Sequence, residues 1–408
     1  MKVVNIIQRY HPAIGGSETW CQGIARYLSG QGVDVKVLTM DVFNEDEYWV
    51  DPPLDNCTAR LGRIEYDNGV LVKRYKRTKI GPLAFSFFKF IVDRKLKIYF
   101  YGPHSIEMYL RLFREVQEAD IVHLHTMPYP HNFFGYFIGR HFGKKIVITP
   151  HFHPGHPFYE RSRNYWLMKN CDSVFAVSNY EKEYLAEKGL KSAKIFTIYN
   201  AIDPKDYEPK DLSQFKMKLF EKYGMKEETK KILFVGRKVD YKGVDVLIEA
   251  VKGIKADFRL FLVGPDYPWF DEFYSRLSPE EKKKIINLGV VTHQEKVNLL
   301  HLCDLLALPS KFEAFGIVFL EAWVCAKPVI GTNSGTMPKL IKDCGFTSDY
   351  GNTVALREKI ELLLSDQGLS RGLGLNGQRK VLQHYTWDSV GANIFSILKE
   401  LNNNGRPR

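Results

Sequence analysis

The sequence predicts an α/β fold made of two Rossmann-like domains that face each other across a cleft. Three observations carry this prediction. Short apolar runs that fit buried strands alternate with helical patterns along most of the chain. The alternation starts twice, at Val3 and at Lys231, and each time the first strand leads into a loop that contains glycine. The chain has 408 residues, which is enough for two or three domains.

In the first half, Val3 to Gln8 predicts a strand, and residues 9–18 predict the loop into a helix. Gly15 and Gly16 in this loop would let the backbone approach a phosphate closely, but the G-x-G-x-x-G spacing of dinucleotide-binding proteins is absent. Residues 41–70 are polar and rich in turn formers, which predicts irregular surface. Further strands are expected at 33–40, 120–125, 146–149, 173–177 and 195–198, and a helix at 105–117.

The second half repeats the pattern after a charged, helical connector. Strands are expected at 231–235, 258–263, 287–291, 305–308 and 329–330, with helices at 279–286 and 294–303. A last amphipathic helix starts near Thr386 or Asp388, either of which could cap it. The predicted organisation is an N-terminal domain over 1–203, a connector over 204–228, a C-terminal domain over 229–385 and a final helical segment over 386–408.

A net charge of +11 predicts an anionic partner without choosing among nucleic acid, anionic lipid and phosphorylated substrate. Residues 73–97 hold nine Lys or Arg, one acid and several Phe, which fits a surface that touches a membrane or a helix packed on its aromatic face. The six cysteines form no CxxC pair and predict reduced thiols in a cytoplasmic protein. Neither a signal peptide nor a membrane-spanning apolar run is visible, so we expect a cytoplasmic location, or the inner face of a membrane.

The segment from Pro309 to Trp323 predicts an anion site. The apolar run before it reads as a buried strand, and the pattern becomes helical after Gly316. The backbone N–H groups of Gly316, Ile317 and Val318 would be unpaired at the positive end of that helix. Glu313 in the loop and Glu321 in the helix would flank the anion, an arrangement that suits a neutral, hydroxylated group such as a sugar or ribose.

Arg237 and Lys242 lie five residues apart in the loop after the strand 231–235, between Gly236 and Gly243. Two bases placed in this way would neutralise a diphosphate, although solvated surface bases are the simpler explanation for any single Arg or Lys. No D-x-D pair occurs, so the sequence predicts no metal held by carboxylates.

Histidines mark the first half. Alternation along the strand 120–125 places His123 and His125 on one face, with His125 at the end of the strand where ligands bind in open sheets. His151, His153 and His156 follow the next strand. Their spacing matches no standard zinc site, which favours a loop that hydrogen-bonds an acceptor or simply lies at the surface.

The two motifs together resemble the retaining glycosyltransferases of family four, also called glycosyl transferase group 1, which have the GT-B fold. The resemblance rests on Glu313 and Glu321 with Phe-Gly between them, and on the GR-x-x-x-x-KG pattern of residues 236–243. It implies a metal-independent enzyme without a cofactor that moves a hexosyl group from a UDP- or GDP-sugar to an acceptor hydroxyl. Glycan, glycolipid or cell-envelope polysaccharide synthesis is the implied setting, with a sugar, a lipid-linked or a polyanionic acceptor.

The resemblance also implies roles for residues. Arg237 and Lys242 would hold the donor phosphates, aided by the backbone at Gly15, Gly16 and the start of the helix at 316–318. Glu313 would hold sugar hydroxyls, and Glu321 the ribose. His125 would contact the donor sugar, and the backbone near Gly264 and Val290 would hold the base. The residues themselves, and not the resemblance, place His151, His153 and His156 on the acceptor side as an expectation. The last helix would cross back to the first domain.

The sequence departs from the family pattern in two places. Residues 334–339 read Ser-Gly-Thr-Met-Pro-Lys where the family often has Gly-Gly-x-Pro-Glu, and Ala201 stands where glycine is usual. A nucleotide-sugar epimerase on the same fold is the alternative enzyme, and a non-catalytic module that binds sugar nucleotides or membranes is the alternative outside enzymes. A nucleic-acid binder is disfavoured because the basic residues belong to no recognised module.

Overall fold

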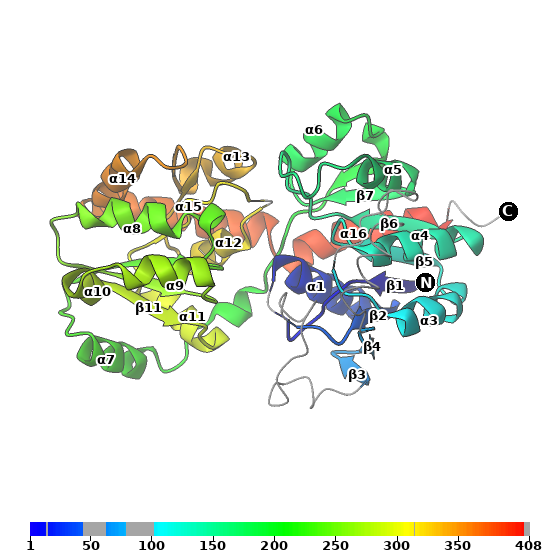
Figure 1. Cartoon of the computed structure of the whole chain (residues 1–408), viewed down its shortest axis with the longest axis horizontal. Helices are drawn as coiled ribbons and strands as arrows, with labels where there is room; N and C mark the ends of the chain where they lie inside the picture. Colours follow the sequence, from blue (N-terminus) through cyan, green and yellow to red (C-terminus); the bar gives the residue numbers. More distant parts are fainter. Residues whose placement is uncertain (14, 44–62, 79–101, 314, 404–408) are drawn as a thin grey trace. The chain divides into compact units, whose positions relative to one another are not determined.

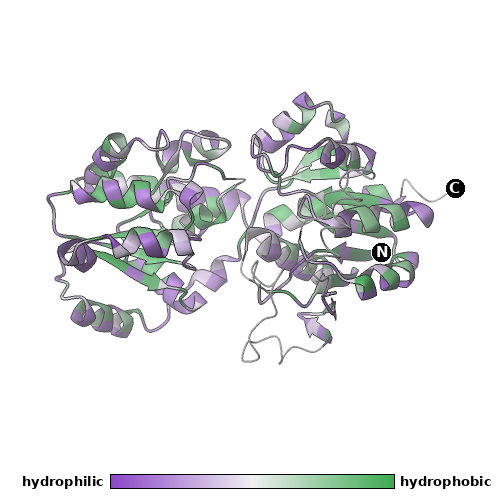
Figure 2. Cartoon of the chain, in the orientation of Figure 1, coloured by the Kyte–Doolittle hydropathy of each residue, from purple (hydrophilic) through white to green (hydrophobic). Residues whose placement is uncertain are grey.

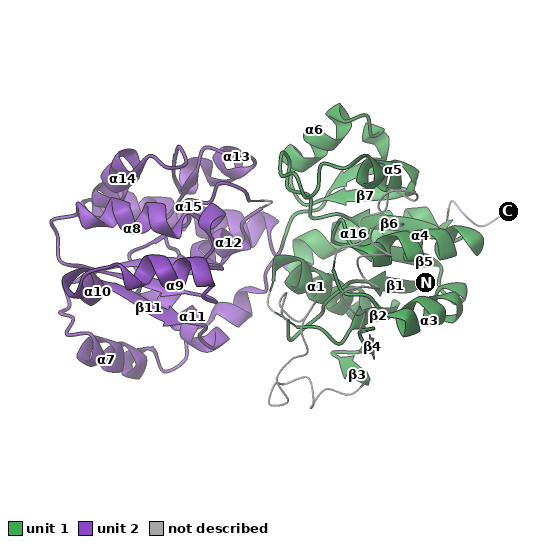
Figure 3. Cartoon of the chain, viewed as in Figure 1, with its two compact units in different colours: residues 1–200, 387–408 green, residues 201–386 purple. Residues whose placement is uncertain are grey.

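The computed structural model describes residues 1–13, 15–43, 63–78, 102–313 and 315–403. The chain forms two compact units (Figure 3). Unit 1 comprises Met1–Asn200 and Trp387–Arg408, and unit 2 comprises Ala201–Thr386. Each unit is a sheet of mainly parallel strands with helices packed against it (Figure 1). The predicted α/β class with two Rossmann-like domains is therefore confirmed.

Unit 1 contains an eight-stranded sheet in the order β3-β4-β2-β1-β5-β6-β7-β8. The strands are β1 (Lys2–Ile6), β2 (Asp34–Met40), β3 (Ile64–Asp67), β4 (Val70–Tyr75), β5 (Ile121–His125), β6 (Lys145–Thr149), β7 (Ser173–Ala176) and β8 (Ile195–Thr197). All described pairs in this sheet are parallel except β3 with β4.

The β3–β4 hairpin corrects the expectation of irregular surface for residues 64–70, whereas residues 44–62 of that stretch lie outside the described residues. Its two-residue turn is Asn68-Gly69, and both residues have positive φ, 47° and 84°. Asn-Gly is the favoured sequence for a tight hairpin turn with two left-handed residues. The strands flanking the turn carry charged residues between apolar ones, and this polarity concealed them in the sequence.

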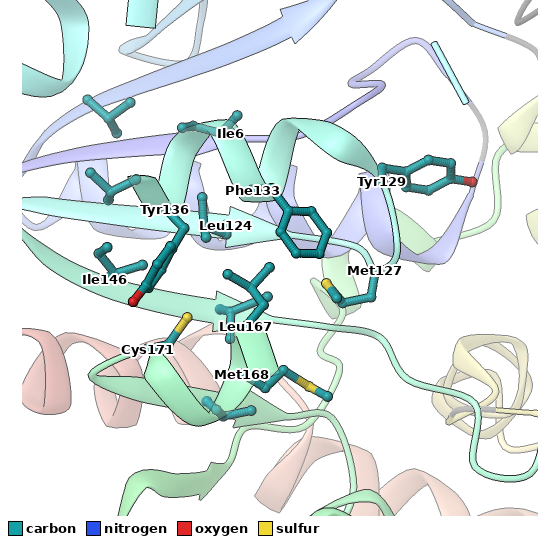
Figure 4. Packing of buried hydrophobic residues seen from close by; sticks show 14 of the residues in the cluster. Ile6, Leu124, Met127, Tyr129, Phe133, Tyr136, Ile146, Leu167, Met168 and Cys171 are labelled. Carbon is teal, nitrogen blue, oxygen red and sulfur yellow. The ribbon is translucent and has the colours of Figure 1, made fainter. Parts of the chain in front are cut away.

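The helices of unit 1 are α1 (Gly16–Gly30), α3 (Ile106–Gln117), α4 (Pro130–His141), α5 (Ser162–Asn170), α6 (Asn179–Glu187) and α16 (Trp387–Asn403), with a short helix η4 (Ser192–Lys194). The apolar strands lie between them, as the hydropathy colouring shows (Figure 2). On one face of the sheet, Ile6, Leu124 and Ile146 belong to the same buried cluster as Phe133 of α4 and Leu167 of α5 (Figure 4).

Helix α16, at the end of the chain, packs on α1 of unit 1. Two glycines face two aromatic rings in this contact: a Cβ on Gly23 would lie 1.8 Å from the Trp387 ring, and a Cβ on Gly391 would lie 2.4 Å from the Tyr27 ring. Real Cβ atoms do not approach so closely, so each glycine makes room for the ring opposite it. The two helices are thus fitted to one another by reciprocal small-to-large contacts.

Unit 2 contains six strands, all paired in parallel, in the order β11-β10-β9-β12-β13-β14. The strands are β9 (Lys230–Val235), β10 (Phe258–Val263), β11 (Ile285–Gly289), β12 (Leu305–Ala307), β13 (Val329–Thr332) and β14 (Gly345–Ser348). The helices are α7 (Leu212–Lys222), α8 (Val244–Lys252), α9 (Pro268–Ser275), α10 (Pro279–Lys284), α11 (His293–Leu302), α12 (Ile317–Val324), α13 (Met337–Ile341), α14 (Thr353–Ser365) and α15 (Gln367–His384), with short helices η5 (Pro204–Tyr207), η6 (Asp240–Lys242) and η7 (Lys342–Cys344).

The boundary between α10 and β11 differs from the sequence expectation. Ile285 and Ile286 continue an amphipathic pattern and were expected in the helix, but they open β11 and pair with Leu260 and Phe261. Short apolar runs fit a helix or a strand equally well, and here the pairing with β10 decides.

The five cysteines in the part of the chain that the structure describes are buried and unpaired, as the sequence predicts, while Cys57 lies outside the described residues. Of the described helices, none has both the length and the hydropathy needed to cross a bilayer. Most of the basic aromatic stretch 73–97 lies outside the described residues, from position 79 onwards.

Candidate functional site

Each sheet has one point where the chain changes direction, and the candidate residues gather there. In unit 2, β9 lies between β10 and β12: the chain builds outward from β9 through β10 to β11 and then resumes at β12 on the other side. In unit 1, β1 lies between β2 and β5 in the same way. Ligands of open parallel sheets bind at such switch points, beyond the carboxyl ends of the strands.

The loops after β9 and β12 are packed together in unit 2. The backbone N–H of Lys311 donates to the carbonyl of Tyr241 at 2.7 Å. Gly243 has a φ of 69°, and a Cβ there would lie 2.2 Å from the carbonyl oxygen of Pro309. Glycine is required at this position both for the left-handed backbone and for the close approach of the second loop.

A salt bridge joins two of the predicted site residues across these loops. Lys242 Nζ lies 2.5 Å from Glu313 Oε2, and each side chain is 13% exposed. Arg237 donates from Nη2 to the hydroxyl of Tyr241 at 2.7 Å. The predicted site residues in these loops are therefore two cations and one carboxylate, and this balance favours an anion.

Helix α12 begins directly at this place. Gly316 is its N-cap with φ 80°, and no side chain caps the helix. A Cβ on Gly316 would lie 2.7 Å from the Phe319 ring. Among the described residues no side chain caps the first N–H groups of α12, at Ile317 and Val318, and the helix dipole gives positive potential in front of them.

Glu321 follows one turn into α12 and is mostly buried. Its Oε1 accepts hydrogen bonds from the Tyr207 hydroxyl at 2.9 Å and from Lys296 Nζ at 2.7 Å. Neither partner was anticipated from the sequence.

The predicted base-side residues also lie at the carboxyl end of this sheet. The Gly264 N–H donates to the Gly289 carbonyl at 2.8 Å, and the side chain of Val290 is 59% exposed. Lys238, which was not predicted, is fully buried and donates to the Gly264 carbonyl at 2.6 Å and to Asp266 at 2.8 Å. Burial lowers the pKa of Lys238 despite the neighbouring carboxylate of Asp266.

In unit 1, His123 and His125 lie on one face of β5, as alternation predicts, with ring centroids 4.0 Å apart. His125 is fully buried, and its Nε2 shares a hydrogen bond of 2.9 Å with Asn5 Oδ1. No described group bonds to its Nδ1. Burial, and then the neighbouring His123, hold the pKa of His125 well below its usual range, so the ring is neutral.

Of the three histidines after β6, His151 packs on Trp20, whereas His153 and His156 both pack on Tyr159. His151 is buried beside Trp20, with ring centroids 5.6 Å apart, and burial lowers its pKa to about 4. His153 packs on Tyr159, and His156 accepts from the N–H of Phe158. Among the described residues no group of three or more His, Cys, Asp or Glu side chains could hold a metal ion.

The start of α1 carries a carboxylate of its own. Gly15 is the N-cap of α1, Gly16 is its first residue, and a Cβ on Gly15 would lie 2.2 Å from Glu18 Oε2. Glu18 is buried and accepts from Arg9 Nε at 2.9 Å. Burial disfavours the ionised form, but the charge of Arg9 together with hydrogen bonds from Ser17, the backbone and Arg9 lowers the pKa of Glu18.

The structure thus brings Arg237, Lys242, Glu313 and the start of α12 together in unit 2, and His123, His125 and His151 together in unit 1. It adds residues that were missed, which are Tyr207, Lys238 and Lys296 in unit 2 and Arg9 and Glu18 in unit 1. The glutamate after Gly15-Gly16-Ser17 was visible in the sequence as an acid in the first turn of a helix.

Two family models match adjoining parts of the chain. A model described as Glycosyltransferase Family 4 matches residues 14–206, and one described as Glycosyl transferases group 1 matches residues 215–380.

Relatives and solved structures agree with these matches. An uncharacterized glycosyltransferase of Methanocaldococcus jannaschii is 25% identical over 399 residues, which are 96% of either chain. The N-acetyl-alpha-D-glucosaminyl L-malate synthase of Bacillus anthracis is 26% identical over 332 residues, 78% of this chain and 84% of the relative. The crystal structure of HepE from Anabaena in complex with UDP and glucose superposes with a TM-score of 0.74 at 18% identity, covering 98% of this chain and 100% of HepE.

Proposed function

This chain belongs to family four of the glycosyltransferases and has their GT-B fold, and from that premise we propose that it transfers a hexosyl group from a UDP- or GDP-sugar to an acceptor hydroxyl. The observation that supports this proposal most directly is the meeting of Lys242, Glu313 and the start of α12 at the switch point of unit 2. It combines charge for a diphosphate with a carboxylate for hydroxyl groups.

The leaving nucleoside diphosphate needs positive charge as the glycosidic bond breaks. Arg237 and Lys242 supply two cations, and the N–H groups of Ile317 and Val318 supply donors at the positive end of a helix. This fixed charge can do the work that a divalent metal does in other transferases, so we propose that the reaction needs neither a metal nor a cofactor. Activity that survives a chelator would support this part of the proposal.

Glu313 then holds hydroxyls of the donor sugar. Its pairing with Lys242 fixes the carboxylate before the donor arrives, and a carboxylate accepts hydroxyl hydrogen bonds on both oxygens. The hydroxyls of the donor sugar would then bond to Glu313, and the charge of the diphosphate would lie at Lys242.

Unit 1 supplies the remaining groups of the proposed reaction. The neutral ring of His125 would contact the donor sugar through Nδ1, and the N-terminal N–H groups of α1 would contact phosphate beside Gly15 and Gly16. His151, His153 and His156 are proposed for the acceptor side. We propose retention of the anomeric configuration, with the leaving phosphate taking the proton of the acceptor hydroxyl on the same face. Trapping a glycosylated residue of the enzyme would contradict this route.

A peripheral membrane location is part of the proposal, with a lipid-linked or polyanionic acceptor in glycan or cell-envelope synthesis. Besides the stretch 73–97, unit 1 has an apolar face on two adjoining helices. In this α3–α4 face, large side chains are 42–68% exposed, and Tyr109 of α3 stacks on Phe134 of α4. The face consists of Ile106, Leu110, Phe113, Phe134 and Phe137.

Arg111 and Arg114 are exposed on the same helix as three of these residues, so the surface suits an anionic bilayer, in which apolar side chains insert and arginines meet headgroups. Sedimentation with vesicles containing phosphatidylglycerol should carry the protein down at low salt. Phe113→Ser should weaken this binding and Leu382→Ser, an exposed leucine of unit 2, should not. Equal binding to neutral phosphatidylcholine vesicles, or none, would contradict the proposal.

The decisive experiment is calorimetric titration with UDP, GDP and ADP and their common sugar conjugates, with chelator present. One nucleotide should bind selectively, and Arg237→Ala should abolish that binding. A protein that converts the donor sugar without an acceptor would be the epimerase, and one that binds the donor without turnover would be the non-catalytic module.

A further inference from the structure

In unit 2, two side chains from different elements bond to one carboxylate, which belongs to a third element. Glu321 extends from α12, Tyr207 from η5 and Lys296 from α11. The Tyr207 hydroxyl and Lys296 Nζ both donate to Glu321 Oε1, at 2.9 Å and 2.7 Å. The Glu321 side chain is 11% exposed and that of Lys296 is 20% exposed. The group is thus nearly closed, with a small opening to solvent.

Both donors use the same oxygen atom, and this asymmetry has a chemical consequence. A carboxylate oxygen has two lone pairs in the carboxylate plane, so two donors fill Oε1. Oε2 receives no hydrogen bond from the described residues in this arrangement. The free acceptor sites of Glu321 therefore all lie on Oε2, and Lys296 has two further N–H bonds beside it.

The Tyr207 hydroxyl keeps its proton near neutral pH and acts as a donor there. Burial, and next the charge of Glu321, raise the pKa of the Tyr207 phenol far above its usual range. A neutral phenol can fix the orientation of the carboxylate without removing its charge. Lys296 partly balances that charge, and its Nζ lies 5.9 Å from the centre of the Tyr207 ring.

We propose that Tyr207 and Lys296 are positioning residues that aim Glu321 Oε2 at the ribose hydroxyls of the donor nucleotide and thereby set the preference for ribose over deoxyribose. The inference rests on the proposed function, in which Glu321 binds the ribose. Two ribose hydroxyls would donate to Oε2, and one could accept from Lys296. Loss of either positioning residue leaves a carboxylate that can rotate, so a ligand with a hydroxyl gains less from it.

The place of Tyr207 in the chain extends the inference. It ends η5, six residues after the start of unit 2 at Ala201. Two hydrogen bonds from α11 hold the same segment. The ring Nε2 of His301 bonds to the Tyr207 carbonyl, and the ring Nε2 of His293 bonds to the Asp206 carbonyl, both at 2.8 Å. The hydroxyl of Tyr207 therefore links the ribose carboxylate to the segment through which unit 2 continues from unit 1.

The test compares ribose and deoxyribose ligands in one titration series. The nucleoside diphosphate that binds best is measured beside its 2′-deoxy and 3′-deoxy analogues, with wild type, Tyr207→Phe, Lys296→Met and Glu321→Gln. Tyr207→Phe and Lys296→Met should each weaken ribonucleotide binding about tenfold, the scale of one hydrogen bond to a charged group, and leave the deoxy analogues within about twofold. The ratio of the two dissociation constants should fall towards that of Glu321→Gln.

Two controls make the result specific. Tyr274→Phe removes a hydroxyl that donates to the Ile285 carbonyl in the same unit, and it should leave the ratio unchanged. Lys296→Arg keeps a cationic donor and should restore part of the ratio. Circular dichroism checks folding, and Lys296→Met decides the matter if Tyr207→Phe does not fold.

Three outcomes would overturn the inference. Equal weakening of ribose and deoxyribose ligands would show a general structural role for the two residues. The ratio could also stay unchanged in Tyr207→Phe and Lys296→Met and fall only in Glu321→Gln. Glu321 would then bind the ribose without help from the two proposed positioning residues. Failure of the wild type to bind any nucleotide would instead remove the donor site and the proposed function together.

Discussion

At the scale of single residues, two opposite charges of the candidate site form a pair. Lys242 and Glu313 neutralise each other across two loops, while Arg237 bonds to a neutral phenol. Removing either member of a partly buried pair leaves the other charge unmatched, and this costs more than the pair itself contributes. Replacing Lys242 and replacing Glu313 should therefore have different effects on nucleotide binding and on sugar transfer.

Lys242→Met should weaken nucleoside diphosphate binding about 10- to 100-fold, because it removes a cation from the proposed phosphate site and leaves Glu313 unpaired. Glu313→Gln should leave this affinity within about threefold and abolish sugar transfer, because the proposed role of the carboxylate is to hold the sugar. Calorimetry and a transfer assay measure the two effects. Lys359→Met, which removes a lysine bonded to the Thr347 carbonyl in the same unit, is the control. Equal loss of nucleotide affinity in both variants would contradict the assignment.

Buried histidines in unit 1 predict acid sensitivity. Burial lowers the pKa of His131 and His151 to about 4 and that of His123 to about 3. An unfolded histidine takes up a proton near pH 6.5, so the unfolded chain binds more protons than the folded chain between about pH 6.5 and about 4. The stability from these groups is complete above about pH 6.5 and is lost as the pH falls, by about 1.4 kcal/mol per pH unit for each histidine.

Chemical unfolding measured from pH 7.5 to 4.5 checks this prediction. In His131→Gln, the free energy of unfolding should depend less steeply on pH, and the slope should fall by the contribution of about one histidine. This holds whatever the substitution does to stability at pH 7.5. The exposed His141→Gln is the matched control. A slope that stays the same in His131→Gln would mean that this ring titrates normally in the folded protein.

Residue identity alone could predict part of the site. Arg237, Lys242, Glu313 and Glu321 stand at fixed spacings within single loops or one loop and its helix, and such local patterns can be read from a sequence. Tyr207 and Glu321 are 114 positions apart, and Lys296 and Glu321 are 25 apart. Nothing local marks these partners, because only tertiary packing brings them to one oxygen atom.

At the scale of helices and strands, the apolar periodicity predicted most of the described strands to within a few residues, but it located no helix at α4, α5, α6, α9, α14 or α15. It failed where two structures compete for the same pattern, as at Ile285-Ile286, and where charged residues stand between apolar ones near a sheet edge, as in β3–β4. The glycines of α1 and α16 could not be interpreted from the sequence either, since their purpose depends on the ring that each one meets.

Replacing glycine with alanine should change the stability in opposite directions at two positions, one in α1 and one in α15. Gly23→Ala should destabilise unit 1 by about 1–3 kcal/mol, because its Cβ would overlap the Trp387 ring. Gly372→Ala, in the middle of α15 with no atom within 4 Å of its Cβ, should stabilise the protein by up to about 1 kcal/mol. Thermal or urea unfolding measures both. A neutral Gly23→Ala would show that α16 can move away from α1 at little cost.

At the scale of the whole molecule, every residue proposed for the nucleotide itself, other than the backbone at Gly15 and Gly16, belongs to unit 2. Residues 201–386 form one continuous segment. Expressed alone, this segment should fold and bind the nucleoside diphosphate within about tenfold of the full chain, the range expected for the loss of one hydrogen bond to a charged group. Calorimetry on the segment checks this, and Arg237→Ala within it is the control. A folded segment that binds no nucleotide would mean that unit 1 supplies an essential contact.

The two ends of unit 2 are neighbours: the Ile202 N–H donates to the Tyr385 carbonyl at 2.9 Å, and Ile202 forms a parallel bridge with Thr386. Unit 2 is inserted into the sequence of unit 1 between Asn200 and Trp387, and the two ends of the insertion lie side by side. In the language of protein engineering, residues 201–386 are an exchangeable cassette. A related cassette with equally close ends could be spliced between Asn200 and Trp387 without a linker, so that different versions of unit 2 could be combined with a constant unit 1.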